Sequence, residues 1–226
     1  MMANQGLCKL LVVDDHETTL SGTVAMLQQQ YPQATILKAK TVQGVFEQLS
    51  NPLPELIVLD LSIPEKSGEY AQTEVGIRLL RKLMRDYPKL NFTVQSTYVN
   101  ALVRVMPEIS IHLGGFTIAD KSLASEEMLA RIEWACQGLT HTKDLRIGQP
   151  GFEVRSEWLE VMRLAFQEGL QDKAIAKQMN VSERTIRIYW TKIRDVLELY
   201  PDAEEENDKN PRIRTEIRAR REGLID

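Results

Sequence analysis

Five polar residues follow short apolar runs in the first part of the chain, and their types suit phosphoryl transfer. They are Asp14, Asp15, Asp60, Ser96 and Lys121. Such runs are typical of buried parallel strands, and ligands bind beyond the carboxyl ends of these strands. Clustered carboxylates repel one another unless a cation lies among them, and a small number of hard oxygen ligands suits Mg²⁺. A Mg²⁺, an ammonium and a hydroxyl around one nucleophilic carboxylate suffice for phosphoryl transfer. The residues therefore predict a metal site that offers one Asp to a phosphoryl donor.

A basic stretch in the C-terminal third is the second candidate site. Residues 173–194 contain six basic residues and one acidic residue, Glu183, although the whole chain has a net charge of -4. The net charge alone argues against a nucleic-acid binder, so the distribution of charge is more informative than its sum. An acidic segment, Asp202–Asp208, follows soon afterwards. It would repel DNA if it lay near the groove, could mask the basic helix in the resting state, or is simply solvated.

Alternating strands and helices are expected to position the first set of residues. Between Lys9 and about His141, short apolar runs alternate with segments whose apolar residues recur at helical spacing. This pattern predicts an α/β fold, a doubly wound five-stranded parallel sheet. Pro107 is expected to leave residues 108–113 irregular or strand-like. Ser125 is expected to cap the last helix. The expected strands are residues 9–14, 34–39, 56–60, 90–96 and 115–119.

The chain is expected to form two domains, 7–141 and 153–226, joined by a linker at 142–152 that is rich in glycine and proline. The second domain is predicted to be small and all-α. Two short helices joined by a tight turn, the second one basic and capped by Ser182, are typical of a helix-turn-helix. A final helix is expected to begin at Asn210-Pro211 and to end at Gly223.

Composition narrows the class of protein. With 226 residues and 43% hydrophobic residues, the chain can form substantial cores. No apolar run approaches the length of a membrane span, and Asp14-Asp15 interrupt the N-terminal apolar stretch before a signal-peptide core could form. A cytoplasmic protein without a membrane partner is expected. Cys8 and Cys136 fit no metal-binding spacing and are expected to be reduced thiols without a function.

Four segments within the first 140 residues together resemble the receiver domain of two-component response regulators. They are residues 11–16 (LVVDDH), 58–64 (VLDLSIP) with Gly68, 94–97 (VQST) and 120–122 (DKS). The resemblance implies a flavodoxin-like fold in which Asp60 accepts a phosphoryl group from a sensor histidine kinase. It implies no enzymatic activity beyond self-phosphorylation and slow self-dephosphorylation.

The resemblance also implies a role for each of the other residues. The carboxylates of Asp14 and Asp15 and the backbone carbonyl of Ser62 would hold Mg²⁺ beside the acceptor. Lys121 would contact the acyl phosphate, and the hydroxyl of Ser96 would swing toward it as the switch.

Three features depart from the receiver pattern. Residues Glu69–Val75 look inserted before the third helix, which could shape kinase choice or phosphate lifetime or be a tolerated surface insertion. Ile118 stands where the family usually has an aromatic residue, and Phe116 cannot be assumed to replace it. Residues 108–113 do not match a clean fourth helix.

The C-terminal region resembles the helix-turn-helix of the LuxR/NarL family over residues 169–189 and the closing helix of that family over residues 214–225. This resemblance implies that Arg187, Ile188 and Thr191 face the major groove of double-stranded DNA. Lys173, Arg184 and Lys192 would hold phosphates. Together the two resemblances imply a transcription regulator that forms a homodimer when phosphorylated, because dimerisation doubles the phosphate contacts.

Two other functions stay open at this point. The near-neutral balance of the second domain is compatible with an adaptor that binds protein partners, with or without control by phosphorylation, and binds DNA weakly. An enzyme that hydrolyses small phosphoesters through an aspartyl intermediate is a further alternative. It would normally place a second carboxylate two residues after the nucleophile, where this chain has Ser62.

Overall fold

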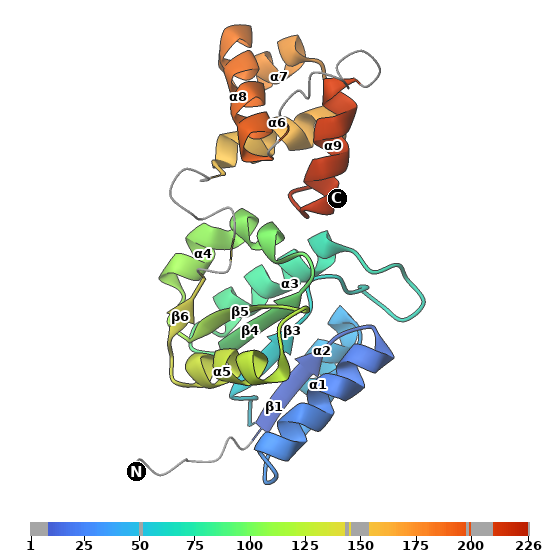
Figure 1. The fold of residues 1–226 in the computed structure, drawn as a ribbon, viewed down its shortest axis with the longest axis vertical. Coiled ribbons are helices and arrows are strands. Elements are labelled where there is room, and N and C mark those ends of the chain that lie inside the picture. Colours follow the sequence, from blue (N-terminus) through green and yellow to red (C-terminus); the bar gives the residue numbers. More distant parts are fainter. Residues whose placement is uncertain are drawn as a thin grey trace. The chain divides into compact units, whose positions relative to one another are not determined.

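The structure is a computed structural model that describes residues 9–49, 52–142, 145, 154–197, 199 and 210–225 (Figure 1). The chain divides into two compact units near residue 145. Cys8, most of the expected linker and the acidic segment Asp202–Asp208 lie outside the described residues. None of the helices in the described ranges combines the length and the apolar character that a membrane span requires.

The N-terminal unit is built on a six-stranded parallel sheet with the strand order β2-β1-β3-β4-β5-β6. The strands and the segments between them alternate as the sequence predicts, and the doubly wound α/β fold is confirmed. The elements are β1 (Lys9–Val13), α1 (Glu17–Gln30), β2 (Thr35–Ala39), α2 (Val42–Gln48), β3 (Leu56–Leu59), α3 (Thr73–Asp86), β4 (Asn91–Ser96), the 3₁₀ helix η1 (Val99–Val105), α4 (Met106–Ile111), β5 (Phe116–Asp120), α5 (Ser125–Cys136) and β6 (Thr140–His141).

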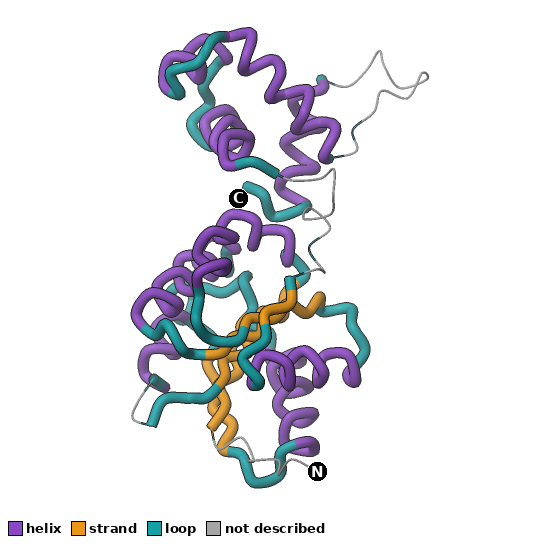
Figure 2. The backbone as a smooth tube through the Cα atoms, turned by 90° about the vertical axis from the view of Figure 1, so that its left-hand side faces the viewer, coloured by secondary structure: helices purple, strands orange, loops and turns teal. Residues whose placement is uncertain are grey.

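Helices cover both faces of the sheet, because its central strands are apolar on both sides. The central strands β1 and β3 are apolar and buried over nearly their whole length, so neither face can be left to water. Helices α1 and α5 pack against the side chains of Leu10, Val12, Leu56 and Val58. The alternate residues of the same strands are also buried, and α2, α3 and α4 adjoin one another in turn. Figure 2 shows the strands enclosed between helices.

The sixth strand is the first difference from the sequence-based prediction. Strand β6 pairs Thr140 and His141 with the first two residues of β5. Two residues are too few to show the alternation of polar and apolar side chains by which a strand is recognised, so the sequence gives no sign of it.

The fourth crossover is the second difference, because the prediction of an irregular or strand-like segment after Pro107 was wrong. Residues 99–105 form η1, and α4 follows directly, with Pro107 in its first turn. The first turn of a helix tolerates proline, since the backbone N–H groups there have no partner within the helix. The residue that was expected to break the segment therefore starts a helix instead.

The start of α5 also differs from the prediction, by one position. Ala124 is the N-cap and Ser125 is already helical, without a side-chain capping bond. Asp120 holds the preceding turn by accepting hydrogen bonds from the backbone N–H and the hydroxyl of Ser122. The aligned peptide dipoles of α5 begin after that turn.

The C-terminal unit is entirely helical in the ranges described, with α6 (Ser156–Phe166), α7 (Asp172–Gln178), α8 (Glu183–Val196) and α9 (Pro211–Arg221). Between α7 and α8, Asn180 adopts a left-handed conformation with φ 55°, which makes the turn tight. Ser182 caps α8 by accepting a hydrogen bond from the N–H of Thr185, as predicted. Asn210 caps α9 in the same way, and that helix ends at Arg221, two residues before Gly223.

Candidate functional site

The carboxyl ends of β1, β3, β4 and β5 meet at one edge of the sheet, where the expected site residues lie. The backbone N–H of Asp60 donates to the carbonyl of Val13, and the N–H of Lys121 donates to the carbonyl of Ser96. These bonds continue the parallel ladder just past the strands. Both Asp14 and Asp60 are only 3% exposed. The ladder thus holds the acidic side chains at fixed positions at the sheet edge.

Lys121 joins two of the carboxylates. Its Nζ donates to Oδ2 of Asp14 and to Oδ2 of Asp60, each at 2.7 Å. Burial alone would lower the pKa of Lys121, but the hydrogen bonds to the two carboxylates and their negative charges outweigh burial and raise this pKa above its ordinary value. The ammonium therefore stays charged between the carboxylates.

The remaining oxygens of the two buried carboxylates are held by the backbone. Oδ1 of Asp60 accepts a hydrogen bond from the N–H of Ser62 at 3.2 Å, and Oδ1 of Asp14 accepts from the N–H of His16 at 2.8 Å. Each bond spans two residues and fixes the carboxylate relative to its own strand end. One carboxylate oxygen of Asp60 therefore bonds to the ammonium of Lys121, and the other bonds to the backbone N–H of Ser62.

The same edge has the donor set of a metal site. Asp14, Asp15, His16 and Asp60 each offer a ligand atom, and these atoms lie within 4.8 Å of one another. Oδ1 of Asp15 is buried and accepts no hydrogen bond from the described part of the chain, although Nδ1 of His16 lies 2.7 Å away. Three carboxylates face one ammonium here, so the cluster keeps an excess of negative charge. Carboxylate-rich sites of this kind fit a hard divalent cation.

His16 was not expected at this site. The sequence-based interpretation gives His16 no role in the site, yet the structure places it beside two of the expected ligands. Its position directly after Asp14-Asp15 was the available signal.

Ser96 lies at the same edge but bonds elsewhere. Its side chain is fully buried, and its Oγ accepts a hydrogen bond from the N–H of Tyr98 at 3.2 Å. The backbone carbonyl of Ser96 contacts Lys121, whereas no hydrogen bond between the Ser96 hydroxyl and the carboxylates is seen among the described residues.

The segment that looked inserted is a loop anchored at both ends. Ile63 and Gln72 form an antiparallel backbone bridge, and Gly68 turns the chain with φ 89°. Helix α3 begins at Thr73, so residues 73–75 of the expected insertion belong to that helix. Tyr70 at the outer part of the loop is 91% exposed.

Ile118, which stands where the receiver family usually has an aromatic residue, and Phe116 both lie on β5. Ile118 is fully buried in the middle of β5, and Phe116 is fully buried at its first residue. The ring of Phe116 lies 6.4 Å from that of Phe92. Phe116 thus starts the strand that Lys121 follows, at the opposite end from the acidic cluster.

The second candidate site is the exposed side of α7 and α8. Ile186, Trp190 and Ile193 of α8 point into the core, and the other side of that helix is open to solvent. Ile188 is 50% exposed although it is apolar. The structure places all six residues expected to contact DNA on the surface, namely Lys173, Arg184, Arg187, Ile188, Thr191 and Lys192.

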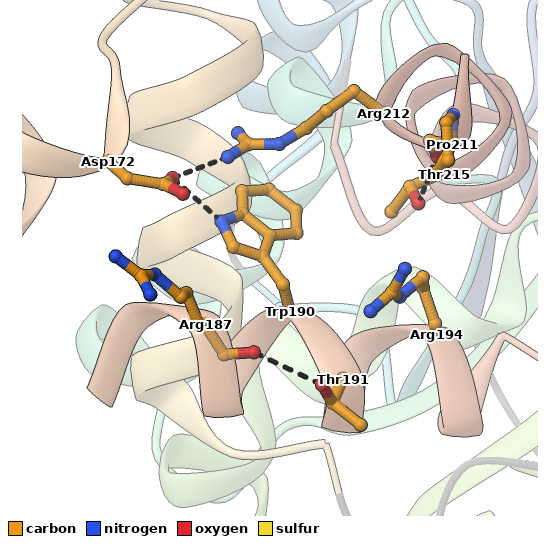
Figure 3. Close-up of a pocket in the computed structure, with 8 residues that line it drawn as sticks. All are labelled: Asp172, Arg187, Trp190, Thr191, Arg194, Pro211, Arg212 and Thr215. Carbon is orange, nitrogen blue, oxygen red and sulfur yellow. Dashed lines mark hydrogen bonds and ion pairs between the residues drawn. The ribbon is translucent and has the colours of Figure 1, made fainter. Parts of the chain in front are cut away.

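A cluster that the sequence did not reveal ties α7, α8 and α9 together (Figure 3). Nε1 of Trp190 donates to Oδ1 of Asp172 at 3.0 Å, and Arg212 donates to the same oxygen. The guanidinium of Arg212 also lies over the Trp190 ring, 3.9 Å from its centre. The basic helix is therefore fixed to the helices on both sides of it in the chain.

Comparisons with known proteins cover the C-terminal unit and most of the whole chain. Residues 158–200 match the family described as bacterial regulatory proteins, luxR family. The chain is 29% identical over 198 residues to the transcriptional regulatory protein YdfI of Bacillus subtilis, covering 82% of this chain and 87% of that protein. It is 22% identical over 203 residues to the DNA-binding transcriptional activator DevR/DosR of Mycobacterium tuberculosis, covering 83% and 87%. The chain therefore resembles response regulators of the LuxR/NarL type, and its residues 158–200 match the luxR family.

Solved structures of the response regulator RcsB share this fold. RcsB of Salmonella enterica serovar Typhimurium, bound to a promoter in the presence of a phosphomimetic, superimposes with a TM-score of 0.60 at 19% identity, covering 96% of this chain and all of that chain. A structure of two RcsB dimers bound to two parallel DNAs gives a TM-score of 0.59 at 21% identity, covering 90% and 97%. At these identities the likeness establishes the fold alone.

Proposed function

We propose that Asp60 of this DNA-binding response regulator accepts a phosphoryl group from a sensor histidine kinase, and that phosphorylation controls its binding to promoters. The observation that carries the proposal is the arrangement around Asp60. Its buried carboxylate bonds to the ammonium of Lys121 and the N–H of Ser62, beside the carboxylates of Asp14 and Asp15.

The residues around Asp60 suit a nucleophile that becomes an acyl phosphate. The added phosphoryl group brings a charge of about −1.5 to −2 at neutral pH. Lys121 already lies at Oδ2 of Asp60, so one positive charge is in place before the phosphoryl group arrives. Positioning and charge neutralisation are the main requirements of phosphoryl transfer, and both are built into this edge of the sheet.

A bound Mg²⁺ would supply the remaining charge neutralisation for the phosphoryl oxygens. Asp14, Asp15 and Asp60, with the backbone carbonyl of Ser62, would hold it. The excess of carboxylates over ammonium groups and the buried Oδ1 of Asp15 support this assignment. We assign no catalytic activity beyond self-phosphorylation and slow self-dephosphorylation.

Ser96 is the proposed switch. Its hydroxyl now accepts the N–H of Tyr98, at the start of the connection from β4 to η1. If the hydroxyl turned toward a phosphoryl group on Asp60, it would release that N–H, and the connection would change its conformation. Phosphorylation would then shift a population between two states of this segment.

The proposed partner of the C-terminal unit is double-stranded DNA. This proposal also implies that the protein acts in the cytoplasm. The exposed arginines and lysine of α8 support phosphate and base contacts. Because the unit has a near-neutral charge balance, we propose that two phosphorylated chains bind together, which doubles the number of phosphates contacted. RcsB, which shares this fold, is described as dimers on DNA.

The proposal is tested by measuring the binding of the full chain to promoter fragments with and without Mg²⁺ and acetyl phosphate. Wild type should bind more tightly after this treatment, and Asp60→Asn should not respond. Affinity should fall as salt rises, because phosphate contacts release counterions. An absence of DNA binding at low salt would contradict the proposal and favour the adaptor function.

A further inference from the structure

A hollow lies between α8 and the start of α9, and three of the eight side chains that line it are arginines. Its volume is about 320 Å³. Figure 3 shows Arg187 and Arg194 extending from α8 on either side of Trp190, with Arg212 reaching over from α9. The lining residues are Asp172, Arg187, Trp190, Thr191, Arg194, Pro211, Arg212 and Thr215.

The groups around this hollow leave positive charge without a partner. One carboxylate, that of Asp172, faces three guanidinium groups, and its Oδ1 already accepts from Trp190 and Arg212. Within the ranges that the structure describes, no carboxylate pairs with Arg187 or Arg194. Such unpaired guanidinium groups beside a hollow favour an anion, and their planar fork of N–H groups matches the oxygens of a phosphate.

The two hydroxyl groups in the hollow donate their protons to backbone carbonyls, so these protons do not select a neutral ligand. Thr191 donates its hydroxyl proton to the carbonyl of Arg187, and Thr215 donates to the carbonyl of Pro211 (Figure 3). Both hydroxyls therefore bond back along their own helices. The N-terminal turn of α9 adds the positive end of a helix dipole. This lining suits an oxyanion.

The hollow adjoins the surface that is proposed to bind DNA. Arg187 and Thr191 line it and also belong to the set expected in the major groove, and Arg194 lies further along the same helix. A helix in the major groove has a phosphate backbone on each side of it. A hollow beside such a helix therefore lies where a phosphate passes.

We propose that this hollow binds a backbone phosphate of the DNA whose major groove receives α8, with Arg194 and Arg212 donating to its oxygens. The inference rests on the proposed DNA binding of this unit, and it extends the interface from the helix-turn-helix to the start of α9. Contacts of this type position the protein but do not read sequence.

Arg194→Gln in the full chain tests the proposal, with Arg220→Gln as the matched control. Arg220 lies on α9 outside the hollow, pairs with Glu216 at 2.9 Å, and its replacement changes the net charge equally. Log affinity falls as log salt rises. Relative to the control, Arg194→Gln should make this fall shallower by about 0.9, the slope that one phosphate contact contributes. It should weaken binding to promoter and unrelated duplexes by the same factor, on the order of tenfold at low salt. Arg212 is a poorer choice because its loss would also free Asp172 and Trp190.

The outcomes separate this inference from the proposed function. If wild type binds DNA and both variants give the same slope and affinity, the hollow holds no phosphate of the DNA backbone and the inference fails alone. If wild type does not bind DNA at low salt, the inference fails together with the proposed function. If inorganic phosphate raises the melting temperature of wild type but not of Arg194→Gln, while the DNA slopes of the two variants agree, the hollow is a small-anion site and the DNA assignment is overturned. Circular dichroism melting of both variants verifies that they fold alike.

Discussion

Gly76 allows α3 to approach the end of β3, and replacing it with alanine should destabilise the N-terminal unit. A Cβ atom at this position would lie 2.0 Å from the carbonyl oxygen of Leu61. The carbonyl belongs to the backbone and the added Cβ atom would be bonded directly to the backbone at Gly76, so neither can rotate away as the end of a flexible side chain would. Leu61 follows Asp60 directly, and the strain would therefore act on the loop that holds the acceptor. Overpacking costs about 1–3 kcal/mol, and we expect the upper end of that range for Gly76→Ala because the clash is between rigid groups.

Gly22→Ala is the matched control, since it makes the same substitution in a different environment. Gly22 lies inside α1, and a Cβ atom there would meet nothing within 4 Å. Alanine in a helix interior is favoured over glycine by roughly 0.5–1 kcal/mol, so this variant should be stabilised.

Hydrogen exchange of the intact chain, read by mass spectrometry on peptides from β1 and β3, gives the unfolding free energy of this unit separately from the C-terminal one. The two variants should move in opposite directions from wild type. Gly76→Ala as stable as wild type would refute the close approach of α3 to Leu61.

Two further predictions concern buried groups. Burial, reinforced by the charges of nearby glutamates, raises the pKa of Cys136 to about 12. In a Cys8→Ser background, iodoacetamide at pH 8 should therefore modify the native chain about 1000-fold more slowly than the unfolded chain, because the thiolate is the reacting form. Comparable rates would show that the thiol is accessible and unperturbed. Asp172→Ala should lower the unfolding free energy of the C-terminal unit by about 1–2 kcal/mol, because the Trp190 N–H would lose its acceptor and Arg212 its carboxylate. Urea titration followed by tryptophan fluorescence measures this loss, and an unchanged midpoint would show that the cluster contributes nothing.

The part of the phosphoryl site that could be predicted from the sequence is the part fixed by the parallel sheet. An apolar run that ends in an acid places that acid at the carboxyl edge, and parallel strands bring all such ends together. Asp14, Asp60 and Lys121 therefore meet although 107 positions separate the first from the last. The assignment needed only the period of the strands and the rule that they run parallel.

The features that were missed depend on contacts that no local pattern records. Pro107 reads equally well as a helix breaker or as a first-turn residue until the position of η1 is known. Asp172, Trp190 and Arg212 come from three helices, and their contact depends on how these helices pack, which the spacing of apolar residues does not specify. The anion-binding hollow follows from the same packing and was equally invisible.

The central claim is that Asp60 accepts the phosphoryl group, and intact-mass analysis after incubation with Mg²⁺ and acetyl phosphate tests it most directly. Wild type should gain the mass of a single phosphoryl group, Asp60→Asn should gain none, and omission of Mg²⁺ should abolish the gain. A wild-type chain that gains no mass, or an Asp60→Asn chain that gains as much as wild type, would contradict the claim.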